Sequence, residues 1–314
     1  MKLKSIEETM KTQTIKYQTT QKLIRLVSEQ GFKMYEPEYF ESYDRFVLAH
    51  KRIDRQRMVK LMNQSGDVLI LRPDVTSSIA SKIVPLLDEE EALKLFYYAT
   101  TFRENNQGWI DSRKQFGVEW FNAKAFDAEI EVLRLIVAIF ESFQLKYMIE
   151  IGSEAFLKTL FNQLRLSSKE EARLKELIAL KDEYGLNQWL EETQIDSIYK
   201  SFLNRLFRLQ GNPSMLREWL ADKTIPDVFK KSLEELYNVT LLFNDKPIRV
   251  DLSMISEFEY YTGIRFKVVL ENTPKSVLKG GRYCAVNPFG NESITAIGFS
   301  MDSDALLKEL MKNV

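Results

Sequence analysis

Four short segments of the 314-residue sequence place polar residues and glycines inside otherwise apolar stretches. Burying a polar group costs free energy unless the group gains a partner, so such positions are candidates for a binding site. The first segment is LRPDVT, from Leu71 to Thr76, where Arg72 and Asp74 flank a proline directly after a predicted strand. The same hexapeptide is also compatible with an ordinary turn that a salt bridge stabilises.

The second segment consists of two predicted strands joined by a polar loop from Asn105 to Lys114. In the first strand, Arg103 could present its planar, permanently charged guanidinium to a carboxylate or phosphate. In the second strand, Gln115, Gly117 and Glu119 alternate and therefore share one face. The two polar side chains would supply acceptors to a bound amine or imidazole, and the glycine would leave room for it; a solvated sheet face is the alternative.

The third segment is EYYTG, residues 259–263, and the fourth is KGGRY, residues 279–283, which precedes AIGFS, residues 296–300. Paired glycines allow a backbone to approach a ligand closely, and adjacent tyrosines offer flat apolar walls with a polar tip. Taken singly, a glycine pair is also typical of a turn, and a tyrosine pair can be one core residue and one surface residue.

The composition limits the class of protein. The 44 Lys and Arg residues nearly balance the 45 Asp and Glu residues, and the pI is near 6.1, which disfavours general nucleic-acid binding. The single cysteine, Cys284, and the single histidine, His50, predict neither a disulfide framework nor a zinc site, and we expect no cofactor. Residues 1–10 lack the apolar core of a signal peptide, and no stretch approaches the roughly 18 apolar residues of a membrane span, so we expect a cytoplasmic protein.

Apolar periodicity assigns helices and strands to the first half of the chain. Residues Thr12 to Gln30 are predicted to form a helix that ends at Gly31. Residues Phe32 to Phe46 carry aromatics on both sides of a proline, which predicts an extended segment at a buried edge or interface. A helix is predicted after Asp127. The predicted strands of this half are residues 68–71, 95–101, 115–121 and 146–151.

Helical patterns dominate from Ser153 to about Phe243, including a predicted capping box of Ser168 and Glu171. Strand patterns return at residues 248–252, 259–270 and 294–301, and a short helix is predicted from Asp302. Helical material that interrupts one sheet indicates an α+β fold rather than the regular alternation of a doubly wound parallel sheet.

Together and in this order, the four segments resemble successive motifs of the histidyl-tRNA synthetase catalytic domain, and the resemblance covers nearly the whole chain. It implies a class II aminoacyl-tRNA synthetase-like α+β fold, in which helices flank an antiparallel sheet. It also implies a core domain of residues 1–164 and 241–314, a helical insertion of residues 165–240, and a homodimer built partly around Phe32 to Phe46.

The resemblance carries over seven residues to a histidine pocket: Asp74, Thr76, Arg103, Gln115, Glu119, Tyr261 and Tyr283. In the family, the positions of Asp74, Thr76 and Gln115 hold the α-amino group. The position of Glu119 provides a carboxylate that faces the amino acid, and the position of Arg103 contacts its carboxylate or the α-phosphate.

The two tyrosines match family positions around the imidazole. An imidazole has two ring nitrogens that need hydrogen-bond partners, so an acid and phenols on opposite sides suit it better than an apolar pocket would. Such a site rejects analogues because they leave its own buried polar groups unpaired.

Several positions depart from the synthetase pattern. Ser256 stands where the family has an arginine that stabilises the developing charge on phosphorus, so we expect activation of histidine by ATP to fail. Ala305 replaces the arginine that packs on ATP. Asn105 replaces the acidic residue of the second motif, with Glu104 one position early, and Cys284 replaces an aspartate.

The sequence ends at Val314, so we expect no anticodon-binding domain and no tRNA substrate. A histidine pocket without ATP chemistry resembles the regulatory subunit that certain bacteria pair with a short-form ATP phosphoribosyltransferase, the first enzyme of histidine biosynthesis. The leading hypothesis is therefore a non-catalytic regulatory subunit that forms a hetero-oligomer with the catalytic subunit, is required for its activity, and transmits feedback inhibition by histidine.

Three other hypotheses stay open from the sequence. Histidine could be sensed at the interface with the partner instead of in the synthetase-like pocket, because a fold does not by itself place a site. The chain could be a truncated synthetase-like enzyme that activates histidine or a related amino acid. It could also be a purely structural scaffold.

Overall fold

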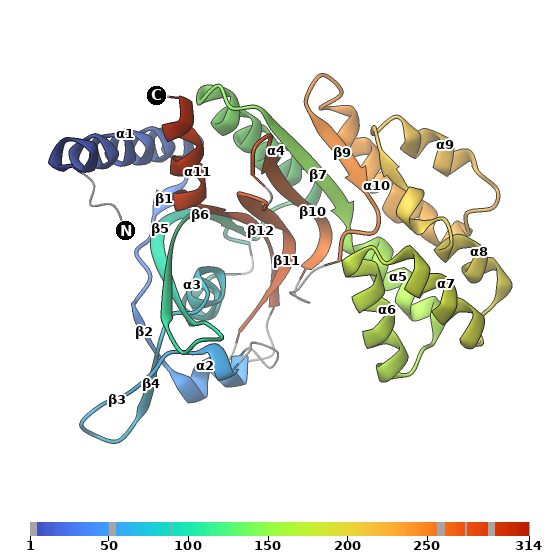
Figure 1. Ribbon diagram of the computed structural model, residues 1–314, viewed down its shortest axis with the longest axis horizontal. Helices are drawn as coiled ribbons and strands as arrows, with labels where there is room; N and C mark the ends of the chain where they lie inside the picture. The colour runs from blue at the N-terminus through green and yellow to red at the C-terminus, as the bar shows by residue number, and fades with distance from the viewer. Residues whose placement is uncertain are drawn as a thin grey trace. The chain divides into compact units, whose positions relative to one another are not determined.

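The chain begins with helix α1 (Ile6–Glu29), whose two ends are specified by local sequence (Figure 1). Ser5 and Glu8 form a capping box, in which the Glu8 N–H donates to Ser5 Oγ at 3.1 Å and the Ser5 N–H donates to Glu8 Oε2 at 3.0 Å. The chain leaves the helix through Gly31, which has a φ of +82°. The predicted helix is confirmed, but it starts earlier than predicted because a capping box, and not the apolar stripe, sets its beginning.

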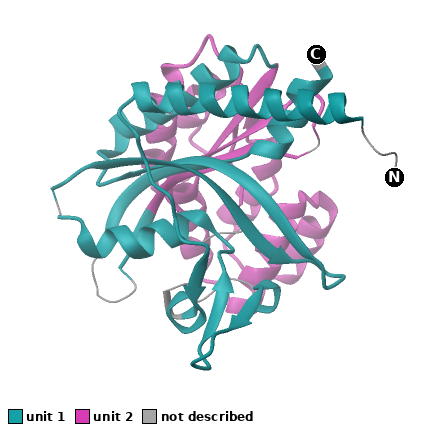
Figure 2. Cartoon of the chain, turned by 90° about the vertical axis from the view of Figure 1, so that its left-hand side faces the viewer, with its two compact units in different colours: residues 1–145, 284–314 teal, residues 146–283 magenta. Residues whose placement is uncertain are grey.

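The computed structural model describes residues 5–49, 55–88, 90–255, 261–273, 275–287 and 293–313. Two compact units divide the chain: unit 1 comprises Met1–Leu145 and Cys284–Val314, and unit 2 comprises Lys146–Tyr283 (Figure 2). The predicted division into a core of residues 1–164 and 241–314 and a helical insertion of residues 165–240 stays a prediction.

Unit 1 is built on a sheet with the strand order β1-β5-β6-β12. Its strands are β1 (Lys33–Met34), β5 (Leu93–Glu104), β6 (Ile110–Phe121) and β12 (Ser293–Asp302). The long strands pair antiparallel, and Gly117 at the centre of β6 lies opposite Tyr97 on β5 and Ser300 on β12. The short strand β1 runs parallel to β5, so the sheet is mixed at this edge rather than antiparallel throughout.

Helices α4 (Ala125–Ser142) and α11 (Ser303–Leu310) pack with α1 and the strands of unit 1. The face of α4 that carries Leu133, Ile136 and Phe140 is fully buried, and each such side chain contributes about 1.5–3 kcal/mol. The sequence placed the start of α4 after Asp127, whereas the helix begins at Ala125 and Asp127 lies in its first turn. A carboxylate in the first turn stabilises the helix by interacting with the positive end of its dipole. In a sequence, such a residue is easily taken for the N-cap.

A second, three-stranded sheet of unit 1 has the order β2-β4-β3. Its strands are β2 (Phe40–Ser42), β3 (Lys60–Met62) and β4 (Val68–Leu71), and helices α2 (Tyr43–Ala49) and α3 (Val75–Ile83) belong to the same region, with the short 3₁₀ turns Arg55–Arg57 and Val84–Leu86. The prediction of an extended segment up to Phe46 is therefore wrong from Tyr43 onward. Helical spacing lets Tyr43, Phe46 and Val47 pack on one cluster with Met58 and Ile70.

Unit 2 has a sheet with the order β11-β10-β7-β9-β8. Its strands are β7 (Tyr147–Ser153), β8 (Gln210–Gly211), β9 (Ile248–Asp251), β10 (Tyr261–Leu270) and β11 (Leu278–Val286), of which only β7 and β9 pair in parallel. Strand β11 was not predicted, because two adjacent glycines are typical of a turn. In the structure Gly280 and Gly281 lie inside the strand.

Six α-helices fall between β7 and β9 in the chain. They are α5 (Glu154–Leu164), α6 (Ser168–Leu180), α7 (Glu183–Glu192), α8 (Ser197–Leu203), α9 (Met215–Ala221) and α10 (Lys230–Leu241). The predicted helical character of this stretch is confirmed. The capping box of α6 is formed by Ser167 and Glu170, one position before the predicted pair, because the same spacing occurs twice in the sequence.

Candidate functional site

Glu119 is the most deeply buried of the predicted site residues, with 1% of its surface exposed, and it lies near the C-terminal end of β6. The Thr76 hydroxyl donates a hydrogen bond to Glu119 Oε1 at 2.5 Å. Thr76 is held there by the first turn of α3, where Asp74 is the N-cap and accepts a hydrogen bond from the Ser77 N–H at 2.7 Å. The LRPDVT segment thus positions a hydroxyl donor for a buried acid, and one oxygen of Asp74 is already used in capping.

Two glycines make room for the side chains of this region. A Cβ on Gly298 would lie 2.3 Å from Glu119 Oε2, so the carboxylate lies directly against β12. A Cβ on Gly117 would lie 2.4 Å from the Tyr97 hydroxyl oxygen, so the Tyr97 ring crosses β6 at that point. The space in front of Gly117, which the sequence assigned to a ligand, is occupied by the Tyr97 phenol.

Tyr97 is a further residue of this polar region that the sequence did not identify. Its side chain has no exposed surface, and its hydroxyl makes no hydrogen bond to any residue that the structure describes. Burial, followed by the negative charge of Glu119, raises the pKa of Tyr97 well above its usual value. The phenol therefore stays protonated and can donate to a ligand. The sequence alone does not identify Tyr97, because only strand pairing shows that it lies opposite Gly117.

Arg103 lies near the hairpin end of the β5–β6 pair, and Gln115 lies near the middle of β6. Arg103 is exposed, and its Nε donates to the Pro73 carbonyl at 3.2 Å, which ties the end of β5 to the residue before Asp74. Gln115 is half-buried and lies opposite Ala99 in the β5–β6 register. Five of the seven predicted residues therefore belong to one polar region of unit 1, around α3 and the strands β5 and β6.

Arg72 has a structural role. Its guanidinium is buried and donates to the carbonyl of Thr100 at 2.9 Å and to those of Pro37 and Glu38 at 2.5 Å. Burial lowers the pKa of Arg72. The salt-bridged turn that was the alternative reading of LRPDVT is replaced by an arginine that joins the segment before β2 to strand β5.

The two remaining predicted residues, Tyr261 and Tyr283, lie in unit 2. They are direct partners in the register of β10 and β11, and both are buried. Lys158 Nζ on α5 donates to the Tyr261 carbonyl at 2.6 Å, and the Arg265 guanidinium lies 5.0 Å from the centre of the Tyr261 ring. Tyr260 and Ser256, which also carried the sequence interpretation, lie outside the described residues.

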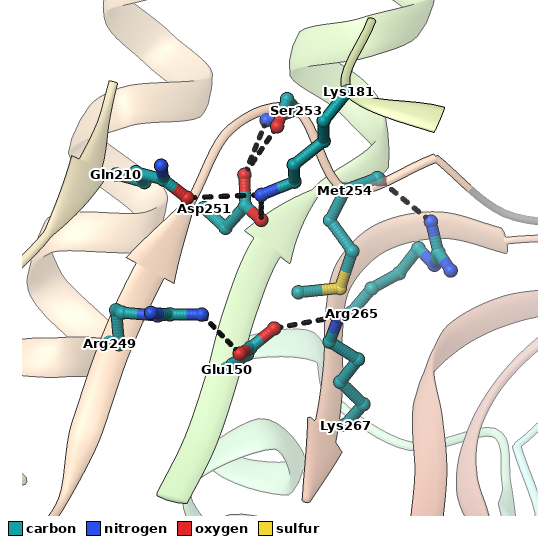
Figure 3. A network of polar contacts seen from close by, with 9 residues as sticks. All are labelled: Glu150, Lys181, Gln210, Arg249, Asp251, Ser253, Met254, Arg265 and Lys267. Atoms are coloured by element: carbon teal, nitrogen blue, oxygen red, sulfur yellow. Dashed lines mark hydrogen bonds and ion pairs between the residues drawn. The ribbon is translucent and has the colours of Figure 1, made fainter. Parts of the chain in front are cut away.

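A network of charges in unit 2 has a structural character (Figure 3). The buried carboxylate of Glu150 forms ion pairs with Arg249 and, at 2.7 Å, with Lys267. Asp251 is buried and pairs with Lys181 at 2.7 Å. Burial alone would raise the pKa of Asp251, but hydrogen bonds from Lys181 and Ser253 outweigh it and lower the pKa.

Asn105, which departs from the synthetase pattern, and Asp302, which precedes the departing position Ala305, have local structural roles. Asn105 shapes the tip of the β5–β6 hairpin, because its side-chain oxygen accepts from the Gln107 N–H at 3.0 Å and the Trp109 N–H at 3.1 Å. Asp302 caps α11 by accepting from the N–H groups of Asp304 and Ala305 at 3.1 and 2.9 Å. Both side chains hold backbone turns in the described part of the chain.

Neither a metal cluster nor a membrane-spanning helix occurs in the ranges that the structure describes. There, no three or more His, Cys, Asp or Glu side chains gather in a way that could hold a metal ion. None of the helices in these ranges has the length and apolar character that crossing a bilayer requires.

Comparison with known proteins places these observations in a family. The family model described as histidyl-tRNA synthetase matches residues 7–306. An ATP phosphoribosyltransferase regulatory subunit of Oceanobacillus iheyensis is 29% identical over 282 residues, which are 88% of this chain and 69% of that protein. One from Bacillus cereus is 26% identical over 307 residues, covering 95% of this chain and 73% of the relative.

Two solved structures are similar in fold. One is described as an ATP phosphoribosyltransferase regulatory subunit/histidyl-tRNA synthetase from Bacillus halodurans, with a TM-score of 0.84 and 25% identity, covering 95% of this chain and 79% of that chain. The other is an ATP phosphoribosyl transferase complex from Thermotoga maritima, with a TM-score of 0.71 and 18% identity, covering 91% and 96%. The predicted class II synthetase-like α+β fold is confirmed.

Proposed function

Because this chain belongs to the histidyl-tRNA synthetase family, we propose that it is the non-catalytic regulatory subunit of ATP phosphoribosyltransferase and acts in the first step of histidine biosynthesis. The names of its relatives support this role. The observation that carries the proposal for a histidine sensor is the buried carboxylate of Glu119, held by Thr76 beside the Tyr97 hydroxyl.

Histidine is the ligand that fits these groups. A carboxylate that is buried to this degree is stable as an anion when several donors or a cation surround it. The ammonium and imidazole N–H groups of histidine supply such donors, in addition to the Thr76 hydroxyl. The protonated phenol of Tyr97 can donate to the second ring nitrogen. In unit 1, the proposed histidine-binding residues are Asp74, Thr76, Tyr97, Arg103, Gln115 and Glu119. Separately, in unit 2, they are Tyr261 and Tyr283.

The proposed absence of catalysis rests on the groups that stand at the nucleotide positions. Ala305 replaces a cation, and Asp302 and Asp304 add acidic side chains beside it at the start of α11. Two carboxylates would repel a triphosphate, because like charges at short range are unfavourable. Ser256 contributes to this argument through the sequence alone.

We propose two assemblies for this chain. The first is a hetero-oligomer with a short-form catalytic subunit, which the similarity in fold to a chain of the ATP phosphoribosyl transferase complex from Thermotoga maritima supports. The second is a homodimer, for which exposed apolar side chains of unit 1 are suitable contacts: Phe40, Leu61 and Met62 on the small sheet, Tyr39 directly before it, and Met34 on β1. In this proposal the protein acts in the cytoplasm and has no tRNA substrate.

Reconstitution tests the function. The chain is co-purified with a short-form ATP phosphoribosyltransferase, and the rate of phosphoribosyl transfer is measured with and without histidine. We expect association, a higher rate in the complex, and inhibition by histidine with a coupling energy of about 1–3 kcal/mol. Failure to associate, or an unchanged rate, contradicts the proposal.

The competing enzyme hypothesis has its own assay. An ATP–pyrophosphate exchange measurement with histidine detects adenylate formation directly. We expect exchange no faster than in the absence of the protein, because the cationic groups of the synthetase pattern are replaced. Robust exchange would support a truncated synthetase-like enzyme in place of the regulatory subunit.

A further inference from the structure

Arg265 occupies an unusual place in strand β10 of unit 2. Its partners in both neighbouring strands are glycines, Gly281 on β11 and Gly152 on β7. A Cβ on Gly281 would lie 3.0 Å from the Arg265 Cα and 2.5 Å from the carbonyl oxygen of Ile264. The strands beside Arg265 therefore cannot carry side chains at this level without a shift of the backbone, and the arginine has a glycine on each side.

The Arg265 guanidinium makes three kinds of contact. It donates to Glu154 Oε2 on α5 at 3.2 Å and to the Met254 carbonyl at 2.9 Å, the latter drawn in Figure 3. It also lies over the ring of Tyr261. The side chains of Arg265 and Glu154 are only 12% and 13% exposed, so solvent screens their ion pair less than it screens a surface pair.

A second contact joins the same helix to the same tyrosine. Lys158 Nζ donates to the Tyr261 carbonyl. Glu154 and Lys158 are four residues apart on α5 and therefore lie on one face of the helix. This face of α5 holds Tyr261 at two points, at its carbonyl directly and at its ring through Arg265.

The other residues of α5 connect it with the helices of unit 2. Phe156 is fully buried, and its ring centre lies 4.9 Å from that of Phe229 and 5.8 Å from that of Phe202 on α8. Packed aromatic rings at these separations transmit displacement, because a close-packed core cannot absorb it. Helix α5 thus lies between Tyr261 and the aromatic core of the helices.

From these contacts we infer that Arg265 is a positioning residue that fixes the Tyr261 ring against α5. Through this contact, histidine bound at Tyr261 changes how well ordered α5 and α8 are. The inference rests on the proposed function, since it assigns a regulatory path to the proposed histidine site. Burial raises the pKa of Glu154, and the charge of Arg265 opposes that shift. The close contact with Arg265 therefore offsets part of the cost of burying this carboxylate.

Two variants and a matched control test the inference in the full-length chain. Arg265→Met removes the guanidinium but keeps an unbranched apolar side chain, and Arg265→Lys keeps the charge. Arg249→Met removes a different cation of unit 2, which pairs with Glu150 and not with Tyr261. For each protein, histidine affinity is measured by calorimetry, and amide hydrogen exchange is measured in α5 and α8 with and without histidine.

We expect histidine to slow exchange in α5 and α8 of the wild-type protein. In Arg265→Met, affinity should fall about tenfold, as for the loss of one charge-assisted contact, and histidine should no longer slow exchange in α8. Arg265→Lys should recover part of both effects. Arg249→Met should behave as the wild type in both measurements.

The outcomes separate this inference from the proposed function. Wild-type affinity together with a wild-type exchange response in Arg265→Met would overturn the inference and leave the histidine site intact. No histidine binding by the wild type would overturn both. If Arg265→Met does not fold, Arg265→Met combined with Glu154→Gln leaves no buried charge without its partner, and the same two results in that double variant decide the question.

Discussion

The two groups of proposed ligand residues are held in place by different physical means. In unit 1, Glu119 and Tyr97 lie against strands whose glycines leave space for them, so the fit is between side chains and backbone. In unit 2, Tyr261 is held by Lys158 and Arg265, long flexible side chains that connect it with α5. A close backbone fit favours a fixed geometry, whereas bonds from flexible side chains can rearrange. The first arrangement suits selective binding, and the second suits transmission.

Buried acids in the two units make a similar contrast. Glu119 on β6 accepts a hydrogen bond from a hydroxyl, and Glu150 on β7 forms ion pairs with two cations in its neighbouring strands. Both are glutamates within a strand and both are buried. Burial of a carboxylate does not by itself mark a binding residue, so substitutions that separate binding from stability are needed.

The largest effect is expected at the glycine that adjoins Glu119. In Gly298→Ala, the new Cβ would lie 2.3 Å from the Val118 carbonyl oxygen as well as from the carboxylate, so the strands must shift. We expect histidine affinity to fall by more than about a hundredfold and the protein to lose about 1–3 kcal/mol of stability. Calorimetry and thermal unfolding measure the two effects.

Gly263→Ala is the matched control in unit 2. There the new Cβ would meet the Arg282 guanidinium at 2.1–2.6 Å, the far end of a flexible side chain that can move away. A loss of affinity as large as that of Gly298→Ala would mean that the two units do not differ in rigidity.

Removing the two buried acids should separate binding from stability. Glu119→Ala deletes a charged acceptor of the proposed site, and we expect histidine affinity to fall by about 1.5–3 kcal/mol, roughly 10-fold to 150-fold, in a protein that still folds. Glu150→Ala leaves Arg249 and Lys267 near the surface, and we expect about 1 kcal/mol of lost stability with unchanged affinity.

Histidine titrations and urea unfolding of both variants provide the check. Unchanged affinity in folded Glu119→Ala would show that the ligand binds elsewhere, as the hypothesis of a site at the partner interface requires. Weakened affinity in Glu150→Ala would show that the network in Figure 3 contributes to binding.

The ion pair between Lys181 and Asp251 should contribute to stability and not to histidine binding, and its contribution should depend on pH. The folded-state pKa of Asp251 lies below the ordinary value of 3.8, so its contribution is present above pH 3.8 and is lost as the pH falls through the lower, folded-state pKa. We expect Lys181→Met to cost about 1–2 kcal/mol at neutral pH, since the lysine is partly exposed. Denaturant unfolding at several pH values tests whether the difference from wild type disappears in acid.

The smallest effect is expected from Tyr97→Phe. This change removes a buried hydroxyl that makes no hydrogen bond to the described residues, so stability should stay the same or rise slightly. Histidine affinity should fall by about 1 kcal/mol, roughly fivefold, if the hydroxyl donates to the ligand. Equal affinities of Tyr97→Phe and wild type in a titration would remove Tyr97 from the site.

Alternation and capping predicted much of the fold but not its details. The strand at residues 68–71 was predicted at its observed limits, because four apolar residues stand between polar neighbours. Helix α2 was missed since it is only seven residues long and is stabilised by tertiary contacts of Phe46. Strand β11 was missed because cross-strand pairing, and not the propensity of Gly280 and Gly281, makes it a strand.

The sequence by itself determined the family, the class of fold and the polar residues of the candidate site, because motif order, strand alternation and residue chemistry are written along the chain. Only the tertiary structure decided what those residues contact. It put Tyr97 in the space at Gly117, turned Asp74 into a helix cap, and made Arg72 a link between backbone segments. The physical reason is that hydrogen bonds and close packing depend on strand register, which brings together residues that are distant in sequence.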